Sequence, residues 1–164
     1  MNPAILHILH QAFFGGIAAA GFAVLFNCHP RMLPLCFGAG ALALAARTIG
    51  QELGCSLAVA SFFAALLLAI VDKVWQDFPS PRGSVLAVVG SIPMVPGSLA
   101  AKVFISVFAF LRSGQGPGAE ATSAMFETVA TWDNLMMLIF TLAAIGTGLA
   151  LPSLIPRAEI KDEI

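Results

Sequence analysis

The residues best suited to chemistry in this sequence interrupt one of its longest apolar runs. The run covers residues 83–111, and Pro93, Pro96 and Gly97 stand near its middle, followed by Ser98. A helix that begins after such a break presents unbonded backbone N–H groups and the positive end of its dipole. A carboxylate is the natural ligand of that end. We therefore expect an anion-binding break to which the Ser98 hydroxyl contributes; the alternative is a kinked helix or two re-entrant pieces.

Two basic residues could add to this positive potential. Lys102 lies ten residues before Arg112, or about 15 Å along a helix, which is near the middle of a bilayer core about 30 Å thick. A charge at that depth costs from about 2.5 kcal/mol upward and normally faces a cavity or a partner. Lys102 is thus expected to contact substrate or a carboxylate of another subunit. Arg47 is shallower and could clamp a carboxylate with two N–H groups or pair with Glu52.

Four further polar residues are weaker candidates. Asp133 suits the N-cap of the last apolar segment, and Asn134 beside it is a candidate for a polar pathway. His7 and His10 share one helix face near the N-terminus. No carboxylate or cysteine is close to them in the sequence, so we expect wet interfacial histidines rather than a metal site.

No catalytic set stands out in the sequence. The serines lack a histidine and an acid at a matching depth, and H-E-x-x-H, P-loop and G-x-S-x-G patterns do not occur. The three cysteines form no C-x-x-C pair and are expected to be small apolar residues of helices. We expect a protein that is not an enzyme and uses no cofactor or metal. Any transport is then driven by a gradient or by a partner.

The composition decides the class of protein that must position these residues. Of the 164 residues, 59% are hydrophobic and 10% are charged, whereas a soluble domain carries about 25% charged residues. One small globular core cannot bury this much apolar surface. The net charge of −1 leaves no footprint for nucleic acid. The sequence therefore predicts an all-α integral membrane protein in a lipid bilayer.

About five transmembrane helices are expected in a single transmembrane domain, residues 1–156, followed by a polar tail, residues 157–164. The predicted spans are residues 4–27, 32–52, 53–73, 83–111 and 133–154. The fourth has 29 residues and would be about 43 Å long as one helix, which exceeds the bilayer core. It is expected to break at 93–97. Residues 119–132 are expected to form a short helix that is interfacial or leads into the last span.

The charges between the spans predict the orientation. The N-terminus lacks the basic flank and cleavage site of a signal peptide, so the first apolar segment is expected to stay as a span. Five spans put the termini on opposite sides, and most basic residues gather with the C-terminus. Those residues are Arg31, Lys73, Arg82, Arg157 and Lys161. Because basic residues favour the cytoplasm, we expect a multi-pass protein with a cytoplasmic C-terminus.

Three segments resemble a known family. They are FAVLFN at 22–27, IPMVPG at 92–97 and the end of the last span at 148–152. Together with the length and the hydrophobic pattern, they resemble the small, YjjB-like subunit of the threonine/serine exporter family. The most specific element is I-P-M-x-P-G inside a membrane segment. Arg47 also falls where relatives have an arginine, whereas Lys102 is a departure that could tune substrate choice.

The resemblance implies a fold, a partner and a substrate class. Single-chain relatives have about ten spans, with a domain like this one as their C-terminal half. Split relatives pair a small subunit with a larger membrane subunit, and the bilayer is that of the bacterial inner membrane. The family exports L-threonine and L-serine, and one split pair is linked to succinate efflux. All of these substrates carry carboxylates.

Three functions follow as hypotheses. The first is a subunit of an exporter for small carboxylate-bearing metabolites, which works by alternating access with a larger membrane subunit. The substrate would contact Pro93, Pro96, Gly97, Ser98, Lys102, Arg47 and Asn134. The second is a structural or assembly subunit without a substrate site of its own. The third is a passive channel subunit. A higher oligomer is compatible with each of them.

Overall fold

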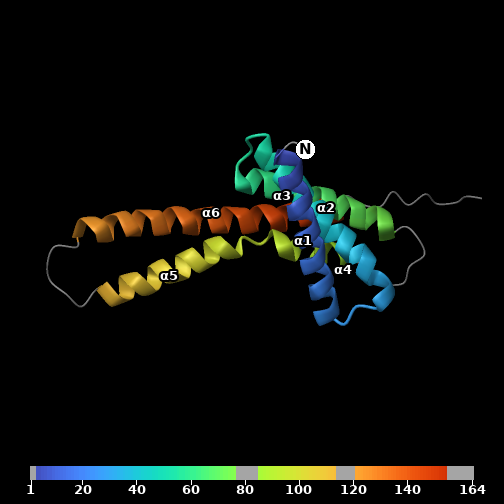
Figure 1. Cartoon of the computed structure of the whole chain (residues 1–164), viewed down its shortest axis with the longest axis horizontal. Helices are drawn as coiled ribbons and strands as arrows, with labels where there is room; N and C mark the ends of the chain where they lie inside the picture. The colour runs from blue at the N-terminus through green and yellow to red at the C-terminus, as the bar shows by residue number, and fades with distance from the viewer. Residues whose placement is uncertain (1–2, 77–84, 114–120, 155–164) are drawn as a thin grey trace, which may run out of the picture.

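The computed structural model describes residues 3–76, 85–113 and 121–154, and no strand occurs among them (Figure 1). Single turns of 3-10 helix, η1 and η2, lie between longer α-helices. In chain order the helices are α1 (Pro3–Leu25), η1 (Pro30–Met32), α2 (Leu33–Glu52), α3 (Leu57–Gln76), α4 (Val85–Ser91), η2 (Ile92–Met94), α5 (Gly97–Ser113) and α6 (Ala121–Leu154). The predicted tail, residues 157–164, and Arg82, Arg157 and Lys161 lie outside the described residues.

The helices reproduce the predicted membrane pattern. Four segments are long and apolar enough to cross a membrane: Pro3–Leu25, Pro30–Glu52, Leu57–Trp75 and Thr131–Leu154. A fifth candidate is a helix pair, Leu86–Met94 and Gly97–Phe108, which is bent by 52° at the break. The expected all-α membrane fold, with about five spans of which the fourth is broken, is confirmed.

The first two spans end in the same way, and the sequence explains how. After α1, Asn27 has φ 54°, and the N–H groups of Asn27 and Cys28 bond back to the carbonyls of Val24 and Ala23. This is the Schellman arrangement, in which one residue takes the left-handed conformation. After α2, Gly54 takes that place with φ 87°. Asn and Gly tolerate this conformation best, so these two residues fix where the spans stop.

Small residues bring α1 and α2 into close contact. A Cβ added to Gly40 would lie 2.6 Å from the carbonyl oxygen of Gly15, and one added to Gly16 would lie 2.7 Å from the Phe37 ring. Ala19 is fully buried at the same contact. Without a hydrophobic driving force between helices in lipid, such close backbone packing is what stabilises a pair. This pair forms one wall of the bundle.

The half-helix α4 lies inside the bundle, packed against α2, α3 and α1. Its Val89 is fully buried, and a Cβ on Gly90 would lie 3.0 Å from the Cβ of Ala39. On the other side α6 packs on α3, where Gly148 approaches the Phe62 carbonyl. The core is therefore built around a helix too short to span, and that helix carries the break.

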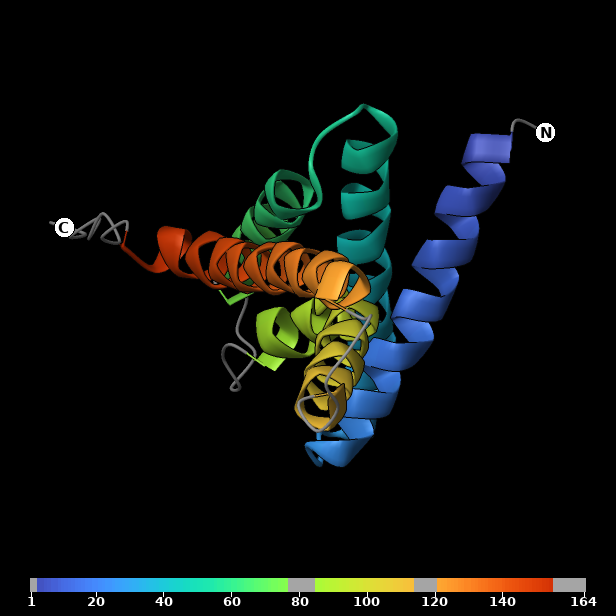
Figure 2. The same cartoon turned by 90° about the vertical axis from the view of Figure 1, so that its left-hand side faces the viewer.

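Beyond the break the chain leaves the bundle. Helix α5 and the first part of α6 run side by side as an arm that projects from the other helices (Figure 1), and Figure 2 looks along this arm. Aromatic residues on it are largely exposed, with Phe104 at 66%, Phe108 at 71% and Phe140 at 63%. We call α5 with residues 121–140 of α6 the α5–α6 arm. In a membrane this apolar surface needs lipid or protein against it.

The structure decides between the alternatives for residues 119–132 and corrects the expectation for Asp133. The described part of 119–132 leads into the last span, because α6 is continuous from Ala121 to Leu154. Asp133 consequently lies inside a helix and is not an N-cap. The reason is tertiary: α6 packs first on α5 and then on α3, so packing extends the helix through a position at which the sequence alone allowed it to begin.

Candidate functional site

The two prolines of the break unwind the backbone between α4 and α5. Proline has no N–H to donate to the preceding turn. The chain therefore passes from α4 into η2, and Val95 is extended, with φ −63° and ψ 125°. Helix α5 restarts at Gly97, and the N–H groups of Leu99 and Ala100 both bond to the Pro96 carbonyl, at 3.0 and 3.2 Å. The Ser98 N–H makes no backbone hydrogen bond among the described residues.

Arg47 completes the break from another helix. In a continuous helix the Met94 carbonyl would accept the Ser98 N–H. Here Nη1 of Arg47, on α2, donates to the Met94 oxygen at 2.6 Å. Met94 is fully buried, so its carbonyl needs a partner. The break thus leaves a buried acceptor that the guanidinium of Arg47 satisfies.

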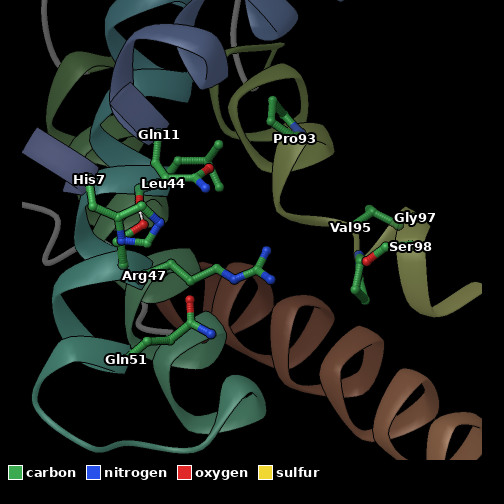
Figure 3. A pocket seen from close by; sticks show the side chains of 11 residues that line it. His7, Gln11, Leu44, Arg47, Gln51, Pro93, Val95, Gly97 and Ser98 are labelled. Atoms are coloured by element: carbon green, nitrogen blue, oxygen red, sulfur yellow. Dashed lines mark hydrogen bonds between the residues drawn. The ribbon is translucent and has the colours of Figure 1, made fainter. Parts of the chain in front are cut away.

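A cavity of about 220 Å³ lies where the break meets α1 and α2 (Figure 3). Its walls combine neutral polar side chains with Arg47, the one fully charged side chain among its lining residues. These residues are His7 and Gln11 of α1, Leu44, Arg47, Thr48 and Gln51 of α2, and Pro93, Val95, Pro96, Gly97 and Ser98 of the break. The cavity lies toward the ends at which α1 begins and α2 finishes.

The structure brings five of the seven predicted site residues together: Arg47, Pro93, Pro96, Gly97 and Ser98. In Figure 3 the Arg47 side chain extends from α2 toward Val95 and Ser98. Because the start of α5 lies at the same cavity, the positive end of its dipole and the guanidinium act in one place. This is the electrostatic arrangement expected of an anion site.

Lys102 and Asn134 do not line this cavity. Lys102 is exposed on α5 and forms no hydrogen bond or ion pair with another described residue. Asn134 is half-buried on α6, where it takes part in an interaction. One turn of helix separates Lys102 from Ser98, but only Ser98 of the two lines the cavity.

Four polar residues that line the cavity were not predicted as ligands from the sequence: His7, Gln11, Thr48 and Gln51. His7 and Gln11 are four apart on α1, and Thr48 and Gln51 are one and four residues after Arg47. Polar residues three or four apart share a helix face, as His7 and Gln11 do on α1 and Thr48 and Gln51 on α2, and this signal could have found them. His7 is not isolated at the interface either, because its Nδ1 lies 3.2 Å from Oε1 of Glu52.

The contacts of Glu52 and Arg47 also decide between earlier alternatives. Glu52 bonds to His7 across α1 and α2, and Arg47 bonds to the Met94 carbonyl. The pair between Arg47 and Glu52 that the sequence allowed is absent from the described part of the chain. No group of three or more histidines, cysteines or carboxylates gathers there as a metal site. The arrangement places one guanidinium and several neutral polar groups around the cavity.

Comparison with known proteins assigns the chain to a family. Residues 11–155 match the family described as Threonine/Serine exporter, ThrE. The chain belongs to this family. A protein of Haemophilus influenzae, described as uncharacterized, is 30% identical over 151 residues, which cover 92% of this chain and 48% of that protein. The chain thus spans about half the length of this curated relative. No solved structure matches it.

The threonine/serine exporter match includes Arg47 and the whole break. It makes the chain part of a family of membrane transporters, and the helices long enough to span agree with a multi-pass membrane protein. His7 is the one lining residue of the cavity that precedes the matched range.

Proposed function

We propose that this chain is a subunit of an exporter for small carboxylate-bearing metabolites, and that the cavity at the break holds the substrate. The observation that carries the proposal is the meeting of Arg47 with the break around one cavity. Arg47 and the start of α5, with Ser98, would bind the carboxylate. Membership of the threonine/serine exporter family supports a substrate of this class.

The size of the cavity supports a small substrate. Its volume of about 220 Å³ equals that of about seven liquid water molecules at about 30 Å³ each. Serine, threonine and succinate have seven or eight non-hydrogen atoms, so each of them is of the right size.

The lining also favours one kind of carboxylate. One guanidinium lines the cavity, beside neutral groups that can donate or accept hydrogen bonds: Gln11, Thr48 and Gln51. A dicarboxylate such as succinate would have only His7, which already bonds to Glu52, for its second charge, whereas the hydroxyl and ammonium of serine or threonine can use the neutral groups. We therefore propose L-serine and L-threonine as the preferred substrates over succinate.

The other half of the pathway is proposed to come from a larger membrane subunit. This chain covers 48% of the length of its Haemophilus influenzae relative, and its α5–α6 arm exposes a broad apolar surface. The cavity lies toward one end of α1 and α2, which would give access from one side of the membrane. Alternating access with the partner would open it to the other side, with the C-terminus in the cytoplasm of the bacterial inner membrane.

Gly97→Leu tests the substrate site. Gly97 lines the cavity, and a Cβ there meets nothing within 4 Å, so a leucine adds bulk at the cavity wall without a clash at its Cβ. We expect loss of binding of radiolabelled L-threonine and L-serine to the full chain in nanodiscs. In cells preloaded with these amino acids, we expect loss of export. Gly146→Leu is the matched control, because a Cβ on Gly146 also meets nothing within 4 Å but lies on α6, away from the cavity.

The outcome separates the proposal from the structural-subunit alternative. If the Gly97→Leu protein inserts, assembles and exports as the Gly146→Leu control does, the cavity is not the substrate site. Pro96→Ala is a second test of the site. Alanine restores a backbone N–H, so the break can become helical without any added bulk. Unchanged export in both variants would leave the chain with an assembly role.

A further inference from the structure

The hydrogen bond between Arg47 and Met94 connects the cation of the cavity to the backbone of the break. Nη1 of Arg47 donates to the Met94 carbonyl at 2.6 Å, and Met94 is fully buried. With the guanidinium in place, this carbonyl is sealed from solvent and takes its hydrogen bond from Arg47. The unwound shape of the break therefore depends on a side chain from α2.

The Arg47 guanidinium has N–H donors that do not bond to Met94 and can bind a ligand. It carries five N–H groups in one plane, and it can present two parallel N–H groups to a carboxylate. The bond to Met94 uses one N–H of Nη1, which leaves the edge formed by Nε and Nη2. Since Arg47 also lines the cavity, one rigid group can hold the break and a carboxylate at the same time.

The break in turn sets the direction of the α5–α6 arm. Helix α5 begins at Gly97, three residues after Met94, and it leaves the line of α4 at 52°. Val95 between them is extended, and the proline at 96 removes a backbone N–H that could stiffen the turn. Two backbone bonds lie across this stretch, from the Val95 N–H to the Ile92 carbonyl and from the Gly97 N–H to the Val95 carbonyl. The contact with Arg47 is the side-chain bond that ties α2 to it.

We infer that Arg47 is a positioning residue for the break as well as a ligand, and that it transmits occupancy of the cavity to the break. The inference rests on the proposed function, because it takes a small carboxylate as the ligand. A bound carboxylate on Nε and Nη2 fixes the plane of the guanidinium in the orientation that donates to Met94. The guanidinium then leaves the Met94 carbonyl less often when the cavity is filled, and the break opens less often.

Hydrogen–deuterium exchange of the full chain in nanodiscs tests whether Arg47 positions the break and whether a ligand in the cavity slows the opening of the break. The reporters are the amides of residues 92–99, apart from the two prolines, with and without L-threonine. In Arg47→Ala without ligand, we expect these amides to exchange roughly ten times faster or more, which is the effect of losing a hydrogen bond to a charged donor. Arg31→Ala is the control, since Arg31 is an exposed cation of η1 outside the cavity.

Arg47→Lys distinguishes coupling from a merely structural role. Lysine keeps the charge and can donate to Met94, but it lacks the planar fork that serves two acceptors. We expect near-normal exchange of the break without ligand and loss of the slowing that L-threonine causes in the wild type. Helix α3 (Leu57–Gln76) contributes no residue to the cavity. Slow exchange of its amides shows that a variant is folded.

Each result has a definite meaning. If the break in folded Arg47→Ala exchanges as in the wild type, Arg47 does not position it and the inference is wrong. If the wild type binds L-threonine in a scintillation assay while exchange of the break is unchanged, coupling is wrong and the proposed function survives. If the wild type binds none of L-threonine, L-serine and succinate but Arg47→Ala loosens the break, the positioning role stands and the proposed function fails.

Discussion

Replacing Gly40 by alanine should separate the two helices that carry most of the cavity. The added Cβ would lie 2.6 Å from the carbonyl oxygen of Gly15 and even closer to the Cβ of Ala19. A carbon needs at least 3.0 Å from such an atom. The obstacle is backbone, which cannot rotate away, so α1 must move from α2 by at least 0.4 Å.

The size of the effect follows from this geometry. Overpacking a tight contact costs about 1–3 kcal/mol. For a chain of 150–250 residues each kcal/mol lowers the midpoint of thermal unfolding by about 2–4 °C, so we expect a decrease of about 2–12 °C. Gly38→Ala is the matched control, because it lies two residues away on α2 and its Cβ would meet nothing within 4 Å. There the better helix propensity of alanine should leave stability equal or slightly higher.

The full chain in lipid nanodiscs can be heated with a thiol-reactive dye. Cys36 of α2 is fully buried, so its labelling reports loss of the contact between the helices. Cys28, which is half-buried, and Cys55, which is exposed, are replaced by serine throughout. Equal midpoints for Gly40→Ala and Gly38→Ala would refute the claim that α1 and α2 are held by backbone contact at Gly40. A lower midpoint for Gly40→Ala alone supports it.

Two further predictions follow from the same kind of reasoning. Gly148→Ala should lower the unfolding midpoint, because its Cβ would lie 2.7 Å from the Phe62 carbonyl oxygen on α3. Gly146→Ala, whose Cβ meets open space, should not lower it, and equal losses in both would contradict the packing described for α3 and α6. Lys102→Gln should leave the affinity for L-threonine within about twofold, as substitutions at exposed positions usually do, since Lys102 lies outside the cavity. A tenfold weakening in equilibrium binding would show that Lys102 reaches the ligand.

Several features could be predicted because they depend on local chemistry. The low content of charge predicts a membrane protein, since water and lipid demand different surfaces. Two prolines three residues apart, with a glycine next to the second, predict an interrupted helix, because the lost N–H groups cannot be replaced within the segment. The residues of the break then identify where an anion site could form. Each of these arguments needs only neighbours in the sequence.

Other features could not be predicted because they depend on which helices touch. Arg47 and Met94 are 47 residues apart, and the sequence offered Glu52 as the nearer partner for the arginine. Lys102 is close to Ser98 in sequence, yet it does not line the cavity. Asp133 has the chemistry of a cap, but packing of α6 on α5 and α3 carries the helix past it.

The amino-acid sequence by itself thus determined the membrane environment, the number of apolar segments and the place of the break, because these follow from hydrophobicity and from the backbone restrictions of proline. Only the tertiary structure decided which polar groups share a cavity. The glycine contact between α1 and α2 brings His7 and Gln11 beside Arg47, and the buried carbonyl of Met94 gives that arginine its place. A buried acceptor must find a donor wherever the fold supplies one, and no spacing along the chain shows where that will be.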